Sequence, residues 1–142
     1  MVTVPRTRTK RPTTGREVTL AEYERIALSD LTAGWELHDG RLRRKPAMSW
    51  DHTNIISELG YVLRHQLNRD EYRVQVDGGR LRRAPKRVYV PDVMVVPTAY
   101  GIPFRGADGG LAMHVEPVPL VVEVWSPSTG GYDVDTKFPL YQ

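Results

Sequence analysis

Two segments of the chain carry apolar side chains at helical spacing. In TLAEYERIAL (residues 19–28), apolar positions recur every three to four residues, which predicts a helix with one buried face. Thr19 is followed three residues later by Glu22, the spacing of a capping box, so we expect the helix to begin directly after Thr19.

A second and longer helix is predicted for SWDHTNIISELGYVLRHQLN (residues 49–68), with Ser49 or Asp51 as its N-cap. Its apolar stripe consists of Ile55, Ile56, Leu59, Val62, Leu63 and Leu67. His52 lies in the first turn of this helix, at the edge of the stripe.

A hairpin is predicted for WELHDGRLRR (residues 35–44), because Asp39-Gly40 is a strong signal for a two-residue turn. This turn places Leu37 opposite Leu42 and Glu36 opposite Arg43. Side chains alternate between the two faces of a strand, so both leucines face the core while Glu36 faces the other way.

Two further segments, VMVV (residues 93–96) and LVV (residues 120–122), are apolar at every position. Such strands are typically covered on both faces and central in their sheet. Asp92 directly precedes the first and Glu123 directly follows the second. Buried carboxylates need a partner or a cation, and Mg²⁺ typically takes one or two of them, together with water and phosphate oxygens.

Each carboxylate also has an ordinary structural interpretation. Asp92 could accept a hydrogen bond from a nearby backbone amide, Glu123 could pair with one of the many arginines, and Glu36 could be a cross-strand partner of Arg43. His52 could be a partly buried histidine bonded to the helix cap.

The charge is distributed unevenly along the 142 residues. Residues 1–16 contain five basic residues and no acidic one, whereas residues 17–142 contain 15 basic and 17 acidic residues. We therefore predict a disordered basic arm over residues 1–16 and one domain over residues 17–142. The arm could contact phosphates without sequence preference, or act only as a solubilising segment.

Several classes of site are excluded or unsupported. The chain has no cysteine, which excludes disulfides and thiolate chemistry. Its histidines lack the spacing of a zinc site, and it contains neither a phosphate-binding P-loop nor a dinucleotide-binding motif. No apolar run is long enough to span a membrane and no secretory signal is present, so we expect a cytoplasmic protein.

Several motifs, in this order, resemble the Uma-two family: WELHDGRL, His52 at the start of a long helix, VPDVMVV, PLVVEVWSPST and DVDTKFPLYQ. These are bacterial restriction-endonuclease-like proteins of the PD-(D/E)xK nuclease superfamily. The resemblance runs from about residue 17 to the end. It implies an α/β (α+β) fold, with a mixed β-sheet core flanked by helices and a divalent metal at the central hairpin.

The resemblance also implies roles for individual residues. Asp92 and Glu123 match the two acidic residues that hold the metal, Mg²⁺ or Mn²⁺, with the backbone carbonyl of Val124 as a further ligand. The superfamily lysine would fall at Trp125, and Lys137 is the matching lysine. Three other positions match the family. Glu36 would support a metal-bound water, and His52 would contact phosphate or lie in the second layer around the metal. Tyr141 also matches, but no role follows for it.

Two features depart from the family pattern. Pro139 lies just after Lys137, so the last helix must start late, near Asp135 or Thr136, or be kinked. Relatives continue past this point with more of that helix and further strands, so we expect a domain that lacks its usual C-terminal elements. The exposed sheet edge that this would leave favours a homodimer.

The sequence supports three functions. The first is a metal-dependent endonuclease that hydrolyses DNA, with Glu36, Asp92, Glu123 and Lys137 converging on one metal site. The second is a truncated remnant of such an enzyme. It would be a catalytically inactive module with the nuclease fold that binds nucleic acid or has a regulatory role. The third is an interaction protein whose acidic residues pair with arginines.

Overall fold

The computed structural model describes residues 13–106, 109–125 and 137–141. The elements follow one another along the chain as β1 (Thr13–Glu17), α1 (Leu20–Ser29), η1 (Leu31–Ala33), β2 (Trp35–His38), β3 (Arg41–Arg44), α2 (Trp50–Gln66), β4 (Tyr72–Val76), β5 (Leu81–Ala84), β6 (Arg87–Tyr89), β7 (Val93–Pro97), η2 (Thr98–Phe104), β8 (Leu120–Val122) and α4 (Phe138–Tyr141). Both η elements are 3₁₀ helices.

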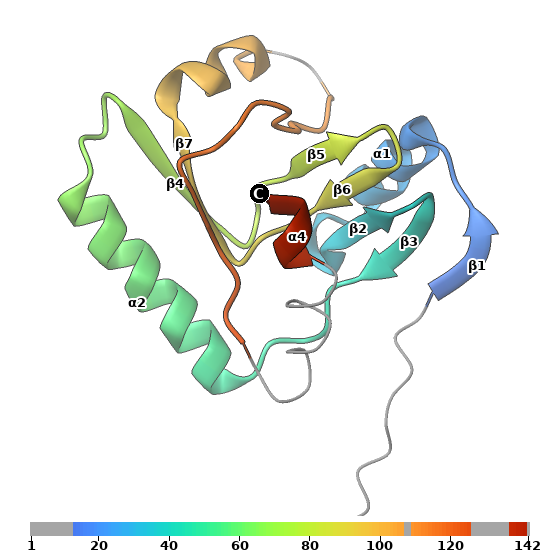
Figure 1. Ribbon diagram of the computed structural model, residues 1–142, viewed down its shortest axis with the longest axis horizontal. Helices are drawn as coiled ribbons and strands as arrows, with labels where there is room; N and C mark the ends of the chain where they lie inside the picture. The colour runs from blue at the N-terminus through green and yellow to red at the C-terminus, as the bar shows by residue number, and fades with distance from the viewer. Residues whose placement is uncertain (1–12, 107–108, 126–136, 142) are drawn as a thin grey trace, which may run out of the picture.

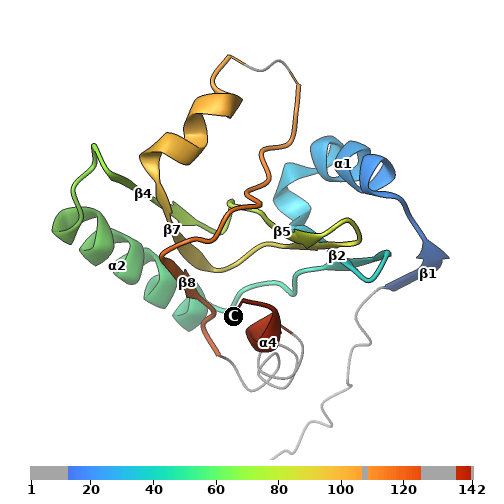
Figure 2. The same cartoon turned by 45° about the horizontal axis from the view of Figure 1, so that its top comes forward.

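The strands form two sheets, one with the order β1-β3-β2-β6-β5 and one with the order β4-β7-β8. The paired strands of both sheets run antiparallel. Helix α1 packs against β2 of the larger sheet, and α2 packs against β4 and β7 of the smaller one (Figure 1). Figure 2 shows the two helices on well-separated parts of the molecule, with α4 between the sheets. The predicted α/β (α+β) class is confirmed.

The segment from residue 87 to residue 97, apolar from Val88 onward except for Asp92, passes from one sheet to the other. Its first part forms β6 in the five-stranded sheet and its last part forms β7 in the three-stranded sheet. Pro91 and Asp92 lie at the crossing, where a proline is tolerated because no ladder hydrogen bond is lost. The carboxylate therefore sits where the two sheets meet.

The two Val-rich strands differ in burial. Residues 93–96 of β7 are buried and lie between β4 and β8, as predicted. Strand β8 has only β7 as a neighbour among the described strands, and its Leu120 is exposed. The prediction that both strands are central is therefore wrong for β8 in the described part of the chain, because a strand paired on one side is not fully covered.

The predicted hairpin of β2 and β3 is confirmed residue by residue. Leu37 pairs with Leu42 and Glu36 pairs with Arg43. Asp39 and Gly40 both have positive φ, 49° and 81°, as a type I′ turn requires. Both leucines are buried in the core cluster that α1 covers.

Both predicted helix starts are also confirmed. Thr19 and Glu22 form a complete capping box at α1. At α2 the cap is Ser49, whose side chain accepts a hydrogen bond from the backbone N–H of His52; Asp51 instead lies in the first turn.

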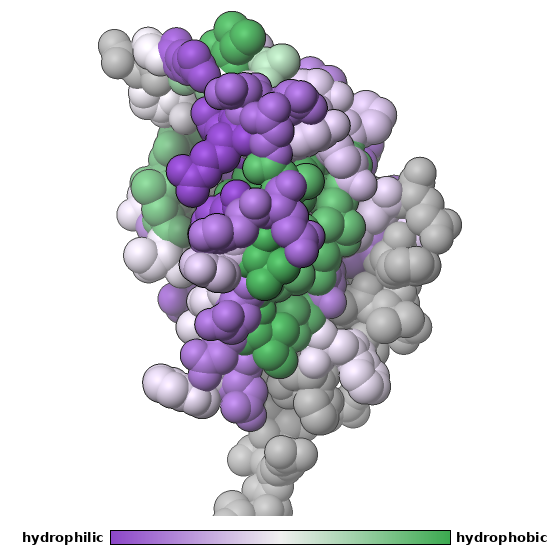
Figure 3. Space-filling model, turned by 90° about the vertical axis from the view of Figure 1, so that its left-hand side faces the viewer, coloured by the Kyte–Doolittle hydropathy of each residue, from purple (hydrophilic) through white to green (hydrophobic). Residues whose placement is uncertain are grey.

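The apolar stripe of α2 is only partly buried. Ile56 and Gly60 face the sheet, whereas Ile55 and Val62 are exposed. A helix over a sheet of three short strands contacts it along a narrow line, so side chains at the edges of the stripe stay in solvent. Figure 3 shows this side of the molecule, with apolar side chains gathered among charged ones.

The structure moves the boundary of the predicted arm. Residues 13–16 belong to β1, which pairs with β3, because backbone hydrogen bonds to a neighbouring strand require no apolar side chains. The prediction of a disordered arm now concerns residues 1–12, which lie outside the described residues. None of the helices in the described ranges has the length and apolar character that crossing a membrane requires.

Replacing Gly40 by alanine tests the turn that fixes this hairpin. A Cβ at Gly40 would lie 2.7 Å from Cγ of Glu17, in a backbone conformation that alanine disfavours. We expect Gly40→Ala to lower the free energy of unfolding by about 1–2 kcal/mol in urea denaturation. Gly101→Ala is the matched control, because nothing lies within 4 Å of a Cβ there; equal losses in both variants would contradict the account.

Candidate active site

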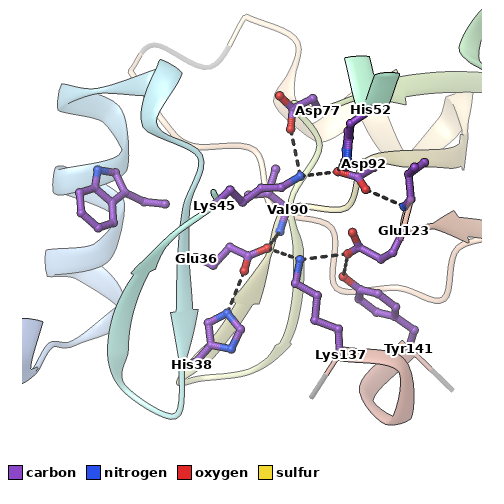
Figure 4. Close-up of polar contacts among 12 residues, drawn as sticks. Glu36, His38, Lys45, His52, Asp77, Val90, Asp92, Glu123, Lys137 and Tyr141 are labelled. Carbon is purple, nitrogen blue, oxygen red and sulfur yellow. Dashed lines mark hydrogen bonds and ion pairs between the residues drawn. The ribbon is translucent and has the colours of Figure 1, made fainter. Parts of the chain in front are cut away.

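Asp92 is the centre of a polar cluster between the two sheets (Figure 4). Its side chain is 2% exposed. Oδ2 accepts a hydrogen bond of 2.7 Å from the backbone N–H of Val124, and Oδ1 lies 2.9 Å from Nζ of Lys45. Nε2 of His52 lies 3.2 Å from the same oxygen. A backbone amide and an ammonium group thus bond to one oxygen each of this carboxylate, and the imidazole nitrogen lies close to Oδ1 without a hydrogen bond to it.

Glu123 lies near Asp92 at the end of the same ladder. Asp92 directly precedes β7 and Glu123 directly follows β8, so both flank the last pair of the antiparallel ladder, Val93 and Val122. Oε1 of Glu123 accepts a hydrogen bond of 2.7 Å from the Tyr141 hydroxyl and lies 3.1 Å from Nζ of Lys137. The contacts made to Glu123 by the described residues use this oxygen, which leaves Oε2 available to a cation.

Lys137 connects Glu123 to Glu36. Its side chain is 2% exposed, and Nζ lies 2.9 Å from Oε1 of Glu36. In the described residues helix α4 spans Phe138–Tyr141, and Pro139 is its second residue. Asp135 and Thr136, near which the helix was predicted to start, lie outside the described residues. Lys137 points into the cluster.

Glu36 is held by the strands of the larger sheet. Oε1 accepts a hydrogen bond of 2.9 Å from the backbone N–H of Val90, and Oε2 lies 2.9 Å from Nε2 of His38. Lys137 links Glu36 to Glu123. Its position suits a residue that orients the lysine.

The sequence analysis did not identify Lys45 and Asp77. Lys45 directly follows β3, and Nζ lies 3.0 Å from Oδ1 of Asp77 as well as 2.9 Å from Asp92. In the sequence Lys45 ends a basic stretch and Asp77 precedes a Gly-Gly turn, so both look like surface residues. The only available signal was position, since each residue directly follows a strand that leads into this junction.

The surroundings lower the pKa of two of the carboxyl groups. Burial alone would raise the pKa of Glu36, but the Lys137 ammonium and the hydrogen bond with His38 lower it to about 2. For Asp92, burial again opposes ionisation. The Lys45 ammonium and the backbone N–H of Val124 nevertheless hold its pKa below the usual range. Both groups are carboxylates at neutral pH.

The pKa of Glu123 is shifted in the opposite direction. Burial raises it to about 7, although Lys137 and the Tyr141 hydroxyl act to lower it, and the charge of Asp92 raises it further. Among the described residues, the cluster contains the carboxyl groups of Glu36, Asp77, Asp92 and Glu123 and the ammonium groups of Lys45 and Lys137, with His38 and His52 beside Glu36 and Asp92. With both imidazoles neutral, full ionisation of these carboxyl groups leaves two negative charges uncompensated, the charge of one divalent cation.

The carboxylate oxygens of this cluster suit Mg²⁺ better than they suit a metal whose ligands are all protein side chains. Among the described residues, no three His, Cys, Asp or Glu side chains are grouped as a metal centre would require. Mg²⁺ is usually bound by one or two carboxylates, and water and substrate complete its six ligands. Asp92 and Glu123 offer two adjacent carboxylates with an excess of negative charge, so the residues fit such an ion.

The remaining candidate residues are placed as follows. His52 lies within reach of Asp92, and its backbone is bonded to the helix cap, so both interpretations describe part of its environment. Trp125, where the superfamily lysine would fall, is 67% exposed. Tyr141, to which the sequence assigned no role, holds Glu123.

Glu123→Gln tests the shifted pKa. Because the folded-state pKa of about 7 lies above the ordinary 4.5, the folded chain binds more protons between these values. Its stability therefore falls as pH rises through that window. Without metal, we expect the wild type to lose on the order of 1–3 kcal/mol of unfolding free energy between about pH 5 and pH 8.

The Glu123→Gln variant should lose much less over the same range, and excess Mg²⁺ should restore stability at the higher pH in the wild type alone. Identical pH dependence in the two proteins would contradict the assignment. The carboxyl groups with lowered pKa, Glu36 and Asp92, affect stability only at more acidic pH, because their contribution is complete above the unfolded-state values of 4.5 and 3.8.

Comparisons with known proteins agree with this fold. The chain superposes with a TM-score of 0.62 on the crystal structure of a "putative nuclease belonging to DUF820" from Anabaena variabilis, at 20% identity. The match covers 86% of this chain and 66% of that structure. Among curated proteins none matches the sequence. The profile of the Uma2 family, described as "Putative restriction endonuclease", matches residues 20–142. Since that match spans most of the chain, the protein belongs to the Uma2 family.

Proposed function

We propose that this protein is a metal-dependent endonuclease that hydrolyses phosphodiester bonds of DNA with Mg²⁺ or Mn²⁺. One observation carries the proposal: Asp92 and Glu123 directly flank the last pair of neighbouring strands β7 and β8, and Lys137 binds Glu123 directly. Two carboxylates and a lysine at one end of a sheet are the groups that such hydrolysis requires. The family described as restriction endonuclease supports the same class of reaction.

Asp92 and Glu123 would hold the ion, and the backbone carbonyl of Val124, the residue after Glu123, would add a ligand. A bound ion would polarise a phosphodiester and lower the pKa of a water ligand. The protein fixes the carboxylates beforehand: the N–H of Val124 and the ammonium group of Lys45 hold Asp92, and the Tyr141 hydroxyl holds Glu123. Oxygen ligands that are already oriented lose little freedom when the ion binds.

Lys137 would act on the reacting phosphate and the attacking water. Its ammonium group can stabilise negative charge that develops on the phosphate oxygens and can orient the water by hydrogen bonding. Glu36 keeps this ammonium group in place from the opposite side. Because Glu36 is also bonded to Val90 and His38, its part is to position Lys137 and to support a metal-bound water.

Two exposed tryptophans close in sequence to site residues support a nucleic-acid substrate. Trp50 is 81% exposed and starts the helix that carries His52, and Trp125 is 67% exposed and follows Val124 directly. Exposed indole rings of this kind stack on nucleobases and tolerate any base sequence. Both side chains would be available to contact nucleotides of a bound substrate.

A catalytically inactive module that binds nucleic acid or regulates is the second candidate. Lys45 and Lys137 already pair with Asp92, Glu36 and Glu123 without a metal, an arrangement that an inactive relative would also show. A homodimer and a cytoplasmic location remain predictions. The exposed apolar side chains of α2 would offer such a dimer a contact surface.

Plasmid nicking in the presence of Mg²⁺ or Mn²⁺ tests the enzyme directly. We expect cleavage that EDTA abolishes. Asp92→Asn should reduce it by at least roughly a hundredfold, because the variant removes a negatively charged ligand of the ion and with it the ion's stabilisation of the transition state. Asp39→Asn is the control, since Asp39 is an exposed acidic residue of the hairpin turn, paired with Arg87 away from the site. Folded wild type that binds DNA but never cleaves it would favour the inactive module.

Trp125→Ala tests the stacking role. Without metal, we expect the variant to bind a short single-stranded oligonucleotide about 1–3 kcal/mol more weakly than the wild type. Fluorescence anisotropy measures this affinity, and Trp125→Phe should retain most of it. Unchanged binding by the alanine variant would remove Trp125 from the substrate path.

A further inference from the structure

Three acidic residues end neighbouring strands at the same level of the small sheet. Val76 pairs with Val93, and Val93 pairs with Val122. The next position outward is therefore Asp77 on the first strand, Asp92 on the second and Glu123 on the third. The backbone N–H of Asp77 donates to the carbonyl oxygen of Asp92 at 2.8 Å, which holds the first two at this level.

Lys45 reaches this row from the other sheet. Its ammonium group lies 3.0 Å from Oδ1 of Asp77 and 2.9 Å from Oδ1 of Asp92, and its side chain is 11% exposed. The residue is well fixed, because its backbone N–H donates to the carbonyl oxygen of Gly34. A Cβ at Gly34 would lie 3.3 Å from Cβ of Lys45, so the glycine leaves room for the lysine stem.

If a metal binds as proposed, Asp92 therefore has a positive charge on each side, the metal ion on one and the ammonium group of Lys45 on the other. The metal would occupy the side of Glu123, and Lys45 occupies the side of Asp77. In phosphodiesterases with two metals, the ions lie about 3.5–4 Å apart and share ligands. The ligand that two such ions share is usually a carboxylate that lies between them. Here the carboxylate is that of Asp92, and the ammonium group of Lys45 takes the place of one of the two ions.

We infer that Lys45 is a positioning residue that occupies the second cation position, so that the site binds one divalent ion rather than two. This inference rests on the proposed metal site between Asp92 and Glu123. Lys45 supplies a permanent positive charge at Asp77 and Asp92. Both Oδ1 atoms lie within 3.0 Å of the ammonium nitrogen, so this group fills the place that a second cation would take.

Counting bound Mn²⁺ by electron paramagnetic resonance at about pH 8 tests the inference, since metal binding needs ionised carboxylates. The wild type should bind one ion per chain. Lys45→Gln should bind two, with the first bound roughly tenfold more tightly, about 1.4 kcal/mol, because the neighbouring positive charge is gone. The double variant Lys45→Gln/Asp77→Asn should return to one ion.

Lys45→Arg keeps the charge and should bind one ion, as should Lys86→Gln, which removes a lysine outside the cluster. If Lys45→Gln unfolds without metal, thermal unfolding gives a second readout, and Mn²⁺ must then raise its Tm more than it raises that of the wild type. Two ions on the wild type, or one ion bound with unchanged affinity by Lys45→Gln, would overturn the inference.

The two proposals fail in distinguishable ways. In the first case the wild type binds no Mn²⁺ but the Lys45→Gln variant binds one ion. This result would support the role of Lys45 and remove the metal from the proposed function. A wild type that binds one ion, with no change on substitution of Lys45, would leave the proposed function intact and remove the role of Lys45.

Discussion

The structure depends on how it compensates the acidic side chains buried where its two sheets meet. Glu36 comes from the larger sheet, and Asp92 and Glu123 come from the smaller one, each at a position largely shielded from water. An ionised carboxylate in such a place is unfavourable unless it is paired. Lys137 joins the sheets by binding one acid from each. Lys45 joins them a second time, by binding the acids at the end of β4 and the start of β7.

The positive charges do not fully compensate the buried acids, and this excess of negative charge relates the structure to the proposed function. The pKa of Glu123 rises to about 7, chiefly because the side chain is buried and also because the charge of Asp92 is close, although Lys137 acts to lower it. A protein selected only for stability gains little from such a group, since an apolar side chain of similar size would avoid the penalty. A site that must bind a divalent cation, in contrast, needs carboxylates with excess negative charge. The same feature that weakens the metal-free protein at neutral pH is the one that would bind the metal.

Much of the fold could be predicted from local sequence signals. Asp39-Gly40 determined the register of the hairpin down to the pair of Glu36 and Arg43, and Thr19 with Glu22 determined the start of α1. These signals act over a few residues, so tertiary contacts do not override them. The division into two sheets was less accessible, because VYVPDVMVV looks like one strand and only long-range pairing shows that it serves both sheets. The burial of α2 was overestimated for the same reason, since its extent depends on the width of the sheet beneath it.

The candidate site shows the same contrast. Asp92 and Glu123 were detectable because a carboxylate beside an all-apolar strand conflicts with the local pattern. Lys45 and Asp77 were not, because a lysine in a basic stretch and an aspartate before two glycines fit a surface interpretation. Their role emerges only when strands distant in sequence bring them within 3.0 Å of each other. Ion pairs between distant segments leave no periodic signal in a sequence, whereas a single acid at the edge of a core strand does.

The most direct test of the central claim is a crystal structure of the protein soaked in Mn²⁺, with the anomalous signal of manganese used to locate the ion. The account predicts one peak per chain, bound by a carboxylate oxygen of Asp92 and by Glu123, with Lys45 still in contact with Asp77. A map without a peak there, in which Lys137 remains bound to Glu123, would show that the lysines alone satisfy the buried acids and would contradict the account.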